Sequence, residues 1–331
     1  MNKQQALAIG IIAVIGGAAL LGAFWYVTSV PDVRIGYLSK DLHQLALRVA
    51  LENDWFEEAG IRVGLVTFQN GALEMDGFLG DQIDMGYLGA APALTKRINQ
   101  DILITVLAAA NLEGSAIMVR KSDYDSGAIT CISDLAGKGV YQPGSSTVQN
   151  FLLRLALDQA GLDFTDLSGT HTTSPVYMAS SLSEDIPAFV AWEPFNAKAE
   201  YDGLAEPLLL SGQIWSRHPC CVLAAANQFM NLHPDIVQKI VEIHVRAQEW
   251  IITHPTEAVA IAVDWLEMEI EPVETAFSRI IYDYNVNNTG LEMYLDFLID
   301  QELLNSDKIP ADTPTFIHDF VNTTYIEEAL G

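Results

Sequence analysis

Apolar residues along most of this chain follow two alternating patterns, short continuous runs and stripes at helical spacing. Residues 33–38 (VRIGYL) form a run that predicts a buried strand. The next apolar positions recur at the spacing of one helix face, at Leu42, Leu45, Ala46 and Val49. Strands that alternate with helices in this way favour a mostly parallel sheet with helices on both faces. Up to residue 109, the predicted strands are 33–38, 61–68, 83–88 and 102–109, and the predicted helices are 41–59, 72–80 and 92–99.

The pattern restarts in the middle of the chain, after a strand at 115–120 that leaves the first unit. Two strands that cross between two β/α units imply two lobes with a cleft between them. We therefore expect an α/β fold in which residues 31–115 and 219–331 form lobe 1 with a helical tail, and residues 116–218 form lobe 2. The later strands are predicted at 139–142, 186–192 and 219–226, and the later helices at 234–253, 255–267, 272–283, 290–302 and 314–329.

An uninterrupted apolar run occupies residues 6–27. As a helix it would span about 33 Å, enough to cross the core of a bilayer. Lys3 precedes the run and an aromatic cluster at 24–26 ends it, which places the short amino end in the cytoplasm and the body outside. A cleaved signal peptide, whose apolar region is usually shorter, is the competing interpretation. We expect residues 1–30 to anchor the chain on the outer face of the cytoplasmic membrane as one transmembrane helix.

Acidic residues dominate the charge of the chain, with 43 Asp and Glu against 17 Lys and Arg and a formal net charge of -26. Such a chain repels a phosphate backbone, so nucleic acid is excluded as a partner. The sequence contains no GxSxG, HExxH or P-loop motif. We therefore expect neither an enzyme nor a cofactor.

Cysteine and histidine residues are few and do not form a known metal motif. Cys131, Cys220 and Cys221 are odd in number and widely spaced, so neither a disulfide framework nor a zinc ribbon is predicted. The adjacent pair is interpreted as two small residues of the buried strand at 219–226. His233, His244 and His254 lie on helices at spacings that do not bring ligands together. No metal site is predicted.

Four loops follow predicted strands and precede helices, at 38–44, 88–92, 142–147 and 192–195. In open α/β sheets, ligands bind at this edge, where helix amino termini offer free N–H groups and about half a positive charge. Asp41 with Gln44 and Ser146 with Gln149 have the spacing of capping boxes. No arginine lies in these loops, and Lys40 is interpreted as a solvated residue. The loops therefore predict a site for a small anion that is built from backbone and hydroxyl donors.

Several segments at these loops resemble the solute-binding proteins of nitrate, taurine and alkanesulfonate importers. The likeness runs from Val33 to about Leu266, and the order and spacing of the segments carry it. They are Ile35-Gly36-Tyr37, Trp55-Phe56-Glu57-Glu58-Ala59-Gly60-Ile61, Asp81-Gln82-Ile83-Asp84-Met85-Gly86-Tyr87-Leu88-Gly89-Ala90-Ala91-Pro92, Asp134-Leu135-Ala136-Gly137-Lys138 with Gly144-Ser145-Ser146-Thr147, Trp192-Glu193-Pro194, and His218-Pro219-Cys220.

This resemblance implies a two-lobe periplasmic-binding type II fold that closes on its ligand by hinge motion. It also implies a monomer that delivers a sulfonate, taurine or nitrate to an ABC permease and its ATPase. Ala90 and Ala91 depart from the hydroxyl or polar residues that many members carry there. The implied ligand-binding residues are Ser39, His43, Gln44, Gly89, Ala90, Ala91, Gly144, Ser145, Ser146, Thr147, Trp192 and Glu193.

Other ligands and one other role stay open at this point. A thiamine-pyrimidine precursor or another small organic acid would suit the same fold, and Asp41 or Glu193 would suit an ammonium group such as that of taurine. Cys220 and Cys221 faintly resemble the cysteine-rich loop of the pyrimidine-precursor synthases that share this fold. A ligand sensor that acts through a partner is the alternative to an importer component.

Overall fold

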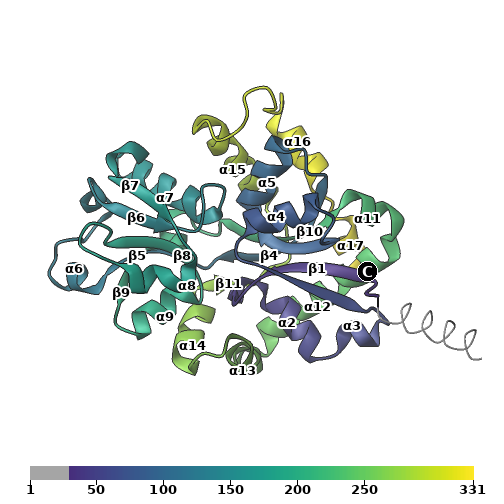
Figure 1. Cartoon of the computed structure of the whole chain (residues 1–331). Coiled ribbons are helices and arrows are strands. Elements are labelled where there is room, and N and C mark those ends of the chain that lie inside the picture. The colour runs from purple at the N-terminus through teal and green to yellow at the C-terminus, as the bar shows by residue number, and fades with distance from the viewer. Residues whose placement is uncertain (1–29) are drawn as a thin grey trace, which may run out of the picture.

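The computed structural model describes residues 30–331 and divides them between two β-sheets, each flanked by helices (Figure 1). The first sheet has the strand order β11-β4-β10-β3-β1-β2, and the second has the order β7-β6-β8-β5-β9. The strands of the first sheet are β1 (Val33–Leu38), β2 (Val63–Phe68), β3 (Met85–Gly89), β4 (Ile104–Glu113), β10 (Pro219–Ala226) and β11 (Ile280–Ile281). Those of the second are β5 (Ser115–Arg120), β6 (Gly139–Gln142), β7 (Gly169–Thr172), β8 (Ala188–Trp192) and β9 (Ala205–Leu210).

Both sheets are mixed, which corrects the expectation of mostly parallel sheets. In the first sheet β1 is parallel to β2 and β3, but β10 is antiparallel to both β3 and β4. In the second sheet β6 is parallel to β7 and β8, whereas β5 is antiparallel to β8 and β9. The antiparallel strands flank the two places where the chain changes sheets. A strand that returns from the other sheet enters from the opposite end, and this reverses its direction.

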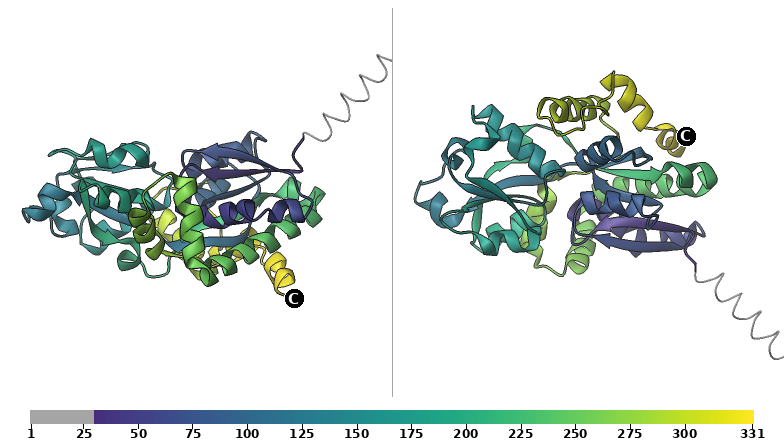
Figure 2. Two further views of the ribbon diagram at one scale, coloured as in Figure 1. Left: turned by 90° about the horizontal axis from the view of Figure 1, so that it is seen from below. Right: turned by 45° about the horizontal axis from the view of Figure 1, so that its top comes forward.

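The chain crosses between the two sheets twice. The chain passes from β4 to β5 through the single residue Gly114, and it returns to β10 after residues 215–218. Figure 2 shows the second sheet and its helices as a unit at one end of the molecule. A third connection comes from the tail, because β11 pairs with β4 while α14 (Ile270–Ser278) packs on α9 (Phe195–Tyr201) of the second unit. We call the units around the first and second sheets lobe 1 and lobe 2.

Helices cover both sheets, and some of them differ from the predicted spans. The helix predicted over 41–59 begins as the 3-10 turn η1, which leads into α2, and α3 is separated from α2 at Asp54, which adopts a left-handed conformation. The helix predicted over 314–329 is divided at residues 321–323. In lobe 1 and the tail the remaining helices are η1 (Leu42–Gln44), α2 (Leu45–Glu52), α3 (Trp55–Glu58), α4 (Gly71–Leu79), α5 (Ala90–Asn99), α11 (Asn227–Leu232), α12 (Pro234–Thr253), α13 (Pro255–Leu266), α15 (Asn288–Asp300), α16 (Thr313–Phe320) and α17 (Thr324–Leu330). In lobe 2 they are α6 (Lys121–Asp125), η2 (Ile132–Leu135), α7 (Val148–Gln159), η3 (Phe164–Asp166), α8 (Pro175–Met178), η4 (Ala179–Ser181) and α10 (Ser211–Ile214).

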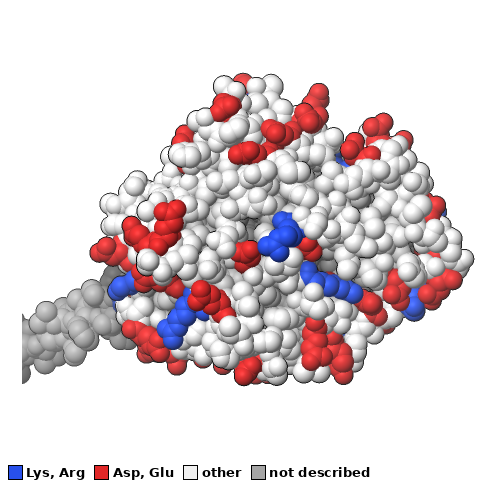
Figure 3. All heavy atoms as spheres, turned by 180° about the vertical axis from the view of Figure 1, so that it is seen from behind, with Lys and Arg blue, Asp and Glu red and all other residues white. Residues whose placement is uncertain are grey.

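The membrane anchor predicted at residues 6–27 lies outside the described residues. Within residues 30–331, no helix combines the length and the apolar character that crossing a membrane requires. On the face drawn in Figure 3, Asp and Glu side chains are scattered over the surface with few Lys and Arg among them. On this face the acidic side chains are therefore spread over the surface and do not gather in one patch, as expected for a solvated acidic protein.

One buried histidine makes the stability of lobe 1 depend on pH. His244 of α12 donates from Nε2 to the Ala109 carbonyl at 2.8 Å, and its Nδ1 lies 3.1 Å from the Tyr87 hydroxyl. Burial lowers the pKa of His244 to about 4, against a bond to Ala109 that raises it. Above pH 6.5 both the folded and unfolded states hold this histidine neutral. Below it only the unfolded chain gains the proton, so stability falls as the pH drops from 6.5 towards 4.

Protonation of this histidine in the unfolded chain should lower the free energy of unfolding by about 3 kcal/mol as the pH falls from 6.5 to 4. Urea unfolding of the wild type and of His244→Gln at a series of pH values isolates the contribution, because the many carboxylates titrate in both proteins. The glutamine variant should lose less stability over this range than the wild type. Parallel curves for the two proteins would contradict the assignment.

Candidate functional site

A small cavity lies where the ends of β1, β3 and β10 in lobe 1 face α7 and β8 in lobe 2. The volume of the cavity is about 20 Å³, which is room for about one water molecule. Within the described part of the chain, no lysine or arginine is among its lining residues. These are Leu38, Asp41, His43, Gly71, Gly89, Pro92, Thr147, Val148, Gln149, Trp192, Cys220 and Cys221. The cavity is therefore an interlobe site at the strand ends where the sequence predicts one.

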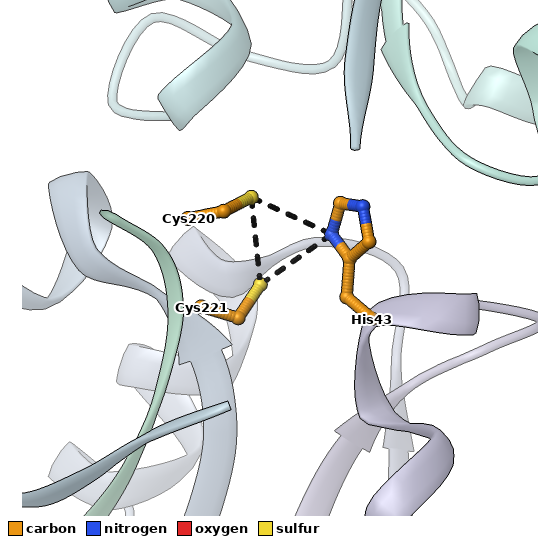
Figure 4. Close-up of side chains that lie close together, drawn as sticks. All are labelled: His43, Cys220 and Cys221. Atoms are coloured by element: carbon orange, nitrogen blue, oxygen red, sulfur yellow. Dashed lines mark hydrogen bonds between the residues drawn. The ribbon is translucent and has the colours of Figure 1, made fainter. Parts of the chain in front are cut away.

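Two adjacent cysteines reach this cavity from β10. Along a regular strand, neighbouring side chains point to opposite faces. The pairing of β10 with β4 shifts register between Pro219 and Cys221 and again between Cys221 and Val222. A bulge of this kind changes the direction of a side chain. As a result the Cys220 and Cys221 sulfurs lie 4.0 Å apart, and both face His43 (Figure 4). The strand prediction for 219–226 is confirmed in its bounds, but alternation along the strand gives no hint of this pairing.

His43 completes the cluster from η1, directly after β1. Its Nδ1 lies 3.5 Å from the Cys220 sulfur and 3.7 Å from the Cys221 sulfur. Its Nε2 donates to the carbonyl of Gly114, at 2.8 Å. Gly114 has a φ of +83°, and a Cβ there would lie 2.4 Å from His43 Nε2. The crossing between the lobes thus fixes the imidazole ring and turns its other nitrogen towards the sulfurs.

Charge in the cluster is unevenly distributed. Burial and the charge of Cys220 act in opposite senses on His43. Burial lowers its pKa, but Cys220 and Asp41 outweigh this effect and raise it to about 10. Burial alone would raise the pKa of Cys220. Its hydrogen bond with Cys221 and the positive charge of His43 instead lower it well below the ordinary thiol value. The hydrogen bond with Cys220, together with burial, raises the pKa of Cys221. These shifts favour a thiolate on Cys220 and an imidazolium on His43.

A carboxylate adjoins this cluster. Asp41 is fully buried, and its Oδ1 lies 3.6 Å from His43 Nδ1 and accepts a hydrogen bond from the His43 backbone N–H at 2.9 Å. Burial raises the pKa of Asp41 to about 6, although His43 lowers it. At neutral pH the lobe 1 side of the cavity therefore carries a carboxylate and a thiolate against a single imidazolium.

Lobe 2 contributes a helix start and an indole. Thr147, not Ser146, caps α7. Its hydroxyl accepts from the Asn150 N–H at 3.3 Å and donates to the Gly144 carbonyl at 2.7 Å. The capping box predicted for Ser146 and Gln149 is therefore wrong, because the helix begins one residue later than expected. Trp192 is buried, and its Nε1–H has no hydrogen-bond partner among residues 30–331, which leaves a donor at the border of the cavity.

The structure brings four of the twelve predicted ligand-binding residues to the cavity lining. They are His43, Gly89, Thr147 and Trp192. Ser39 borders an adjoining hollow of about 430 Å³ that Trp192 also lines. The other seven, Gln44, Ala90, Ala91, Gly144, Ser145, Ser146 and Glu193, do not line the cavity.

Two of these residues have clear structural roles. The Gln44 side chain accepts from the Leu38 N–H at 2.7 Å and donates to the Tyr87 carbonyl at 2.8 Å, so it ties β1 to β3. Glu193 is fully buried and accepts hydrogen bonds from Ala197 and Arg279. Both residues were expected to contact the ligand. The Gln44 amide instead bonds to buried backbone groups, and the Glu193 carboxylate bonds to a backbone N–H and to Arg279.

Cys220 and Cys221 are lining residues that the sequence prediction missed. The available signal was their position at the start of a strand that returns from the other lobe. Such a strand must run beside the ligand-binding edge of the sheet. Their partner His43 is 177 residues away from Cys220 in the sequence, so spacing alone gives no metal or thiol motif.

Known proteins with similar sequences or structures agree with this fold. A protein of Bacillus subtilis (strain 168), named as an aliphatic sulfonates-binding protein, is 23% identical over 344 aligned residues, which cover 100% of this chain and 97% of that protein. The solved periplasmic nitrate-binding protein NrtA from Synechocystis PCC 6803 has a TM-score of 0.79 at 15% identity, with 91% of this chain and 89% of that chain covered. A ligand-binding component of an ABC-type import system from Staphylococcus aureus, solved with zinc bound, has a TM-score of 0.76 at 20% identity, with 90% and 98% covered.

These structures establish that the two mixed sheets form the periplasmic binding protein fold. The family assignment comes from the sequence itself. Residues 28–267, which are most of the chain, match the sequence model of one family. That stretch contains both crossings, the cavity and the His43–Cys220–Cys221 cluster. The chain belongs to the NMT1-like family.

Proposed function

We propose that this chain is the extracytoplasmic solute-binding component of an ABC-type importer, with a type II arrangement of two lobes that close on a small solute. The observation that carries the proposal is the cavity between the lobes, to which β1, β3 and β10 of one lobe and α7 and β8 of the other contribute. A solute bound there contacts both lobes and favours the closed form, which is the form that a permease distinguishes from the open one. The anchor at residues 6–27 would keep the protein beside its permease.

The proposed solute is a small anion of the sulfonate, taurine or nitrate class. The names of the relatives support this class, and so do the donors on the lobe 2 side. The first turn of α7 presents backbone N–H groups, and Trp192 presents an indole N–H without a protein partner. The Cys220 thiolate and the Asp41 carboxylate on the lobe 1 side would repel the negative charge of the solute, so we place its anionic group against lobe 2. The cavity must widen to admit it, since the present volume holds about one water molecule.

Thermal unfolding of the full chain in mild detergent, measured with a panel of solutes, tests this proposal. The panel contains alkanesulfonates, taurine, nitrate, bicarbonate and an aminopyrimidine. A solute at 100 times its Kd should stabilise the folded state by about 2.7 kcal/mol. We expect one of the anions to do so, and Trp192→Ala to reduce its shift.

Removal of the Thr147 hydroxyl separates anion contact from helix capping. Thr147→Val should weaken solute binding, whereas Asp312→Ala, which removes the cap of α16 far from the cavity, should lower only the basal stability. A shift with the aminopyrimidine alone would keep the importer role and replace the solute class. No shift with any solute would overturn the proposed anion, and failure to co-purify with a permease and an ATPase would overturn the importer role.

A further inference from the structure

We infer that His43, Cys220 and Cys221 form a binding site for one thiophilic metal ion, Cu(I) or Zn(II), on the lobe 1 side of the interlobe cavity. The three ligand atoms lie within 4.8 Å of one another and come from two elements of the same lobe. Figure 4 shows both sulfurs and the Nδ1 side of the ring directed at a common point. The inference goes beyond the importer role and does not depend on the identity of the solute.

The distances between the ligand atoms match those around a metal ion. An ion held about 2.3 Å from each sulfur and about 2.0 Å from a nitrogen separates the sulfurs by about 3.8 to 4.0 Å and each sulfur from the nitrogen by about 3.5 to 3.7 Å, across tetrahedral to trigonal angles. The observed separations are 4.0 Å between the sulfurs and 3.5 and 3.7 Å from Nδ1. The cluster therefore has metal-binding geometry without any movement of its side chains.

The orientation of His43 also suits a metal ligand. A ligating imidazole usually donates its other ring N–H to a carbonyl or carboxylate, which fixes the ring and its tautomer. Here Nε2 donates to the Gly114 carbonyl at 2.8 Å, and this leaves Nδ1 to face the sulfurs. The lack of a Cβ at Gly114 permits the contact, because a side chain there would overlap the ring. The ring is held for ligation from the crossing between the lobes.

The donor set selects the class of metal. Binding of the metal releases the protons of Cys221 and of His43 Nδ1 to solvent. The two thiolates and the imidazole that then hold it are soft or borderline ligands, which favour Cu(I) and Zn(II) over Mg²⁺ or Ca²⁺. The Asp41 carboxyl lies beside the cluster, with its Oδ1 3.6 Å from His43 Nδ1. With Cu(I) the three ligands suffice, whereas Zn(II) would take a fourth from water or solute in the cavity. Thr147, Gln149 and Trp192 of lobe 2 cover the position, so the ion enters when the lobes are apart.

Metal titration of the reduced full chain tests the site. Cu(I), supplied without oxygen, and Zn(II) are titrated separately against chromophoric chelators. At least one of them should bind with a stoichiometry of one. X-ray absorption of that complex should show two sulfur neighbours and a nitrogen neighbour. Loss of a ligand should weaken binding by more than about 100-fold, which exceeds the loss usual for a residue that only hydrogen-bonds to a metal ligand.

Variants of the three cysteines supply the comparison. Cys220→Ser and Cys221→Ser should abolish the tight binding, and Cys131→Ser, at an exposed cysteine, should leave it unchanged. His43→Gln is a further ligand variant. If Cys221→Ser does not unfold cooperatively, Cys221→Ala is used in its place. The inference is overturned if neither ion binds at one equivalent, if Mg²⁺ binds equally well, or if Cys131→Ser weakens binding as much as the ligand variants do. The solute panel reports on the importer proposal independently of these results.

Discussion

Replacing Arg279 with leucine is expected to lower the free energy of unfolding by about 3 to 5 kcal/mol, because it leaves a buried carboxylate without its counter-charge. Arg279 begins the segment that leads from α14 to β11, and its guanidinium contacts both Glu193 and Glu200 of lobe 2. The Glu193 side chain is 0% exposed, and that of Arg279 is 14% exposed. The ion pair therefore joins the tail to lobe 2 in a region of low dielectric.

The pH dependence of this loss gives a second readout. Burial raises the pKa of Glu193, and Arg279 opposes the shift. Without the arginine the carboxyl takes up a proton more readily. The gap between the variant and the wild type should therefore narrow as the pH falls. Urea unfolding at several pH values measures both effects.

Two further variants identify the cause. The double variant Glu193→Gln with Arg279→Leu should recover much of the loss, because no buried charge is left unpaired. Arg217→Leu removes an arginine whose side chain is 59% exposed in its pair with Asp283, and it should cost no more than about 1 kcal/mol. Equal losses for Arg217→Leu and Arg279→Leu would show that burial of the pair is not what matters.

Replacing Gly114 with alanine is expected to cost about 2 to 5 kcal/mol and to displace His43. Its φ of +83° strains an L-residue by about 1 to 2 kcal/mol. The new Cβ would also meet His43 Nε2 at 2.4 Å and Ile280 Cγ1 at 2.7 Å, and overpacking of this kind costs about 1 to 3 kcal/mol. His43 is 1% exposed and cannot swing into solvent. Unfolding by urea measures the total loss.

Gly203→Ala is the matched control for this prediction. Gly203 has a φ of +67°, and a Cβ there would have no neighbour within 4 Å, so its replacement reports backbone strain alone. The excess loss in Gly114→Ala over Gly203→Ala then measures the overlap with His43 and Ile280. Equal losses in both variants would mean that the crossing absorbs the added methyl group, and the ring of His43 would not depend on the glycine.

Local patterns in the sequence predict the strands of this protein well. The strands at 33–38, 115–120 and 219–226 have the predicted bounds, because each is a short apolar run bordered by polar or turn residues. The helix at 234–253 is also confirmed, since its apolar stripe is long and Pro234 opens it. The helix predicted over 272–283 is wrong at its end: it stops at Ser278, because Ile280–Ile281 pair with β4 as β11. Other errors came from a local backbone feature. The left-handed Asp54 divides the helix predicted at 41–59, and α7 begins after Thr147 rather than Ser146.

The candidate site was predicted only in part. The sequence singled out loops at strand ends and helix starts, which are local features, and His43, Gly89, Thr147 and Trp192 of these loops line the cavity. It also offered polar residues beside these loops as ligand contacts. The structure instead gives Gln44 to the backbone of β1 and β3, and Glu193 to Arg279. Whether a buried polar group faces a ligand or a protein partner depends on residues far away in the chain.

The alternation of strands and helices in two units and the excess of acidic residues could be predicted from the sequence alone. Each of these follows from local periodicity or from a sum over the whole composition. Only the tertiary structure decided that both sheets are mixed and that Cys220 and Cys221 face His43 together. The register shift in β10 depends on its pairing with β4, and the orientation of His43 depends on the Gly114 carbonyl. The first joins segments that are 110 residues apart at Asn111 and Cys221, and the second joins residues 71 apart, so no local pattern encodes them.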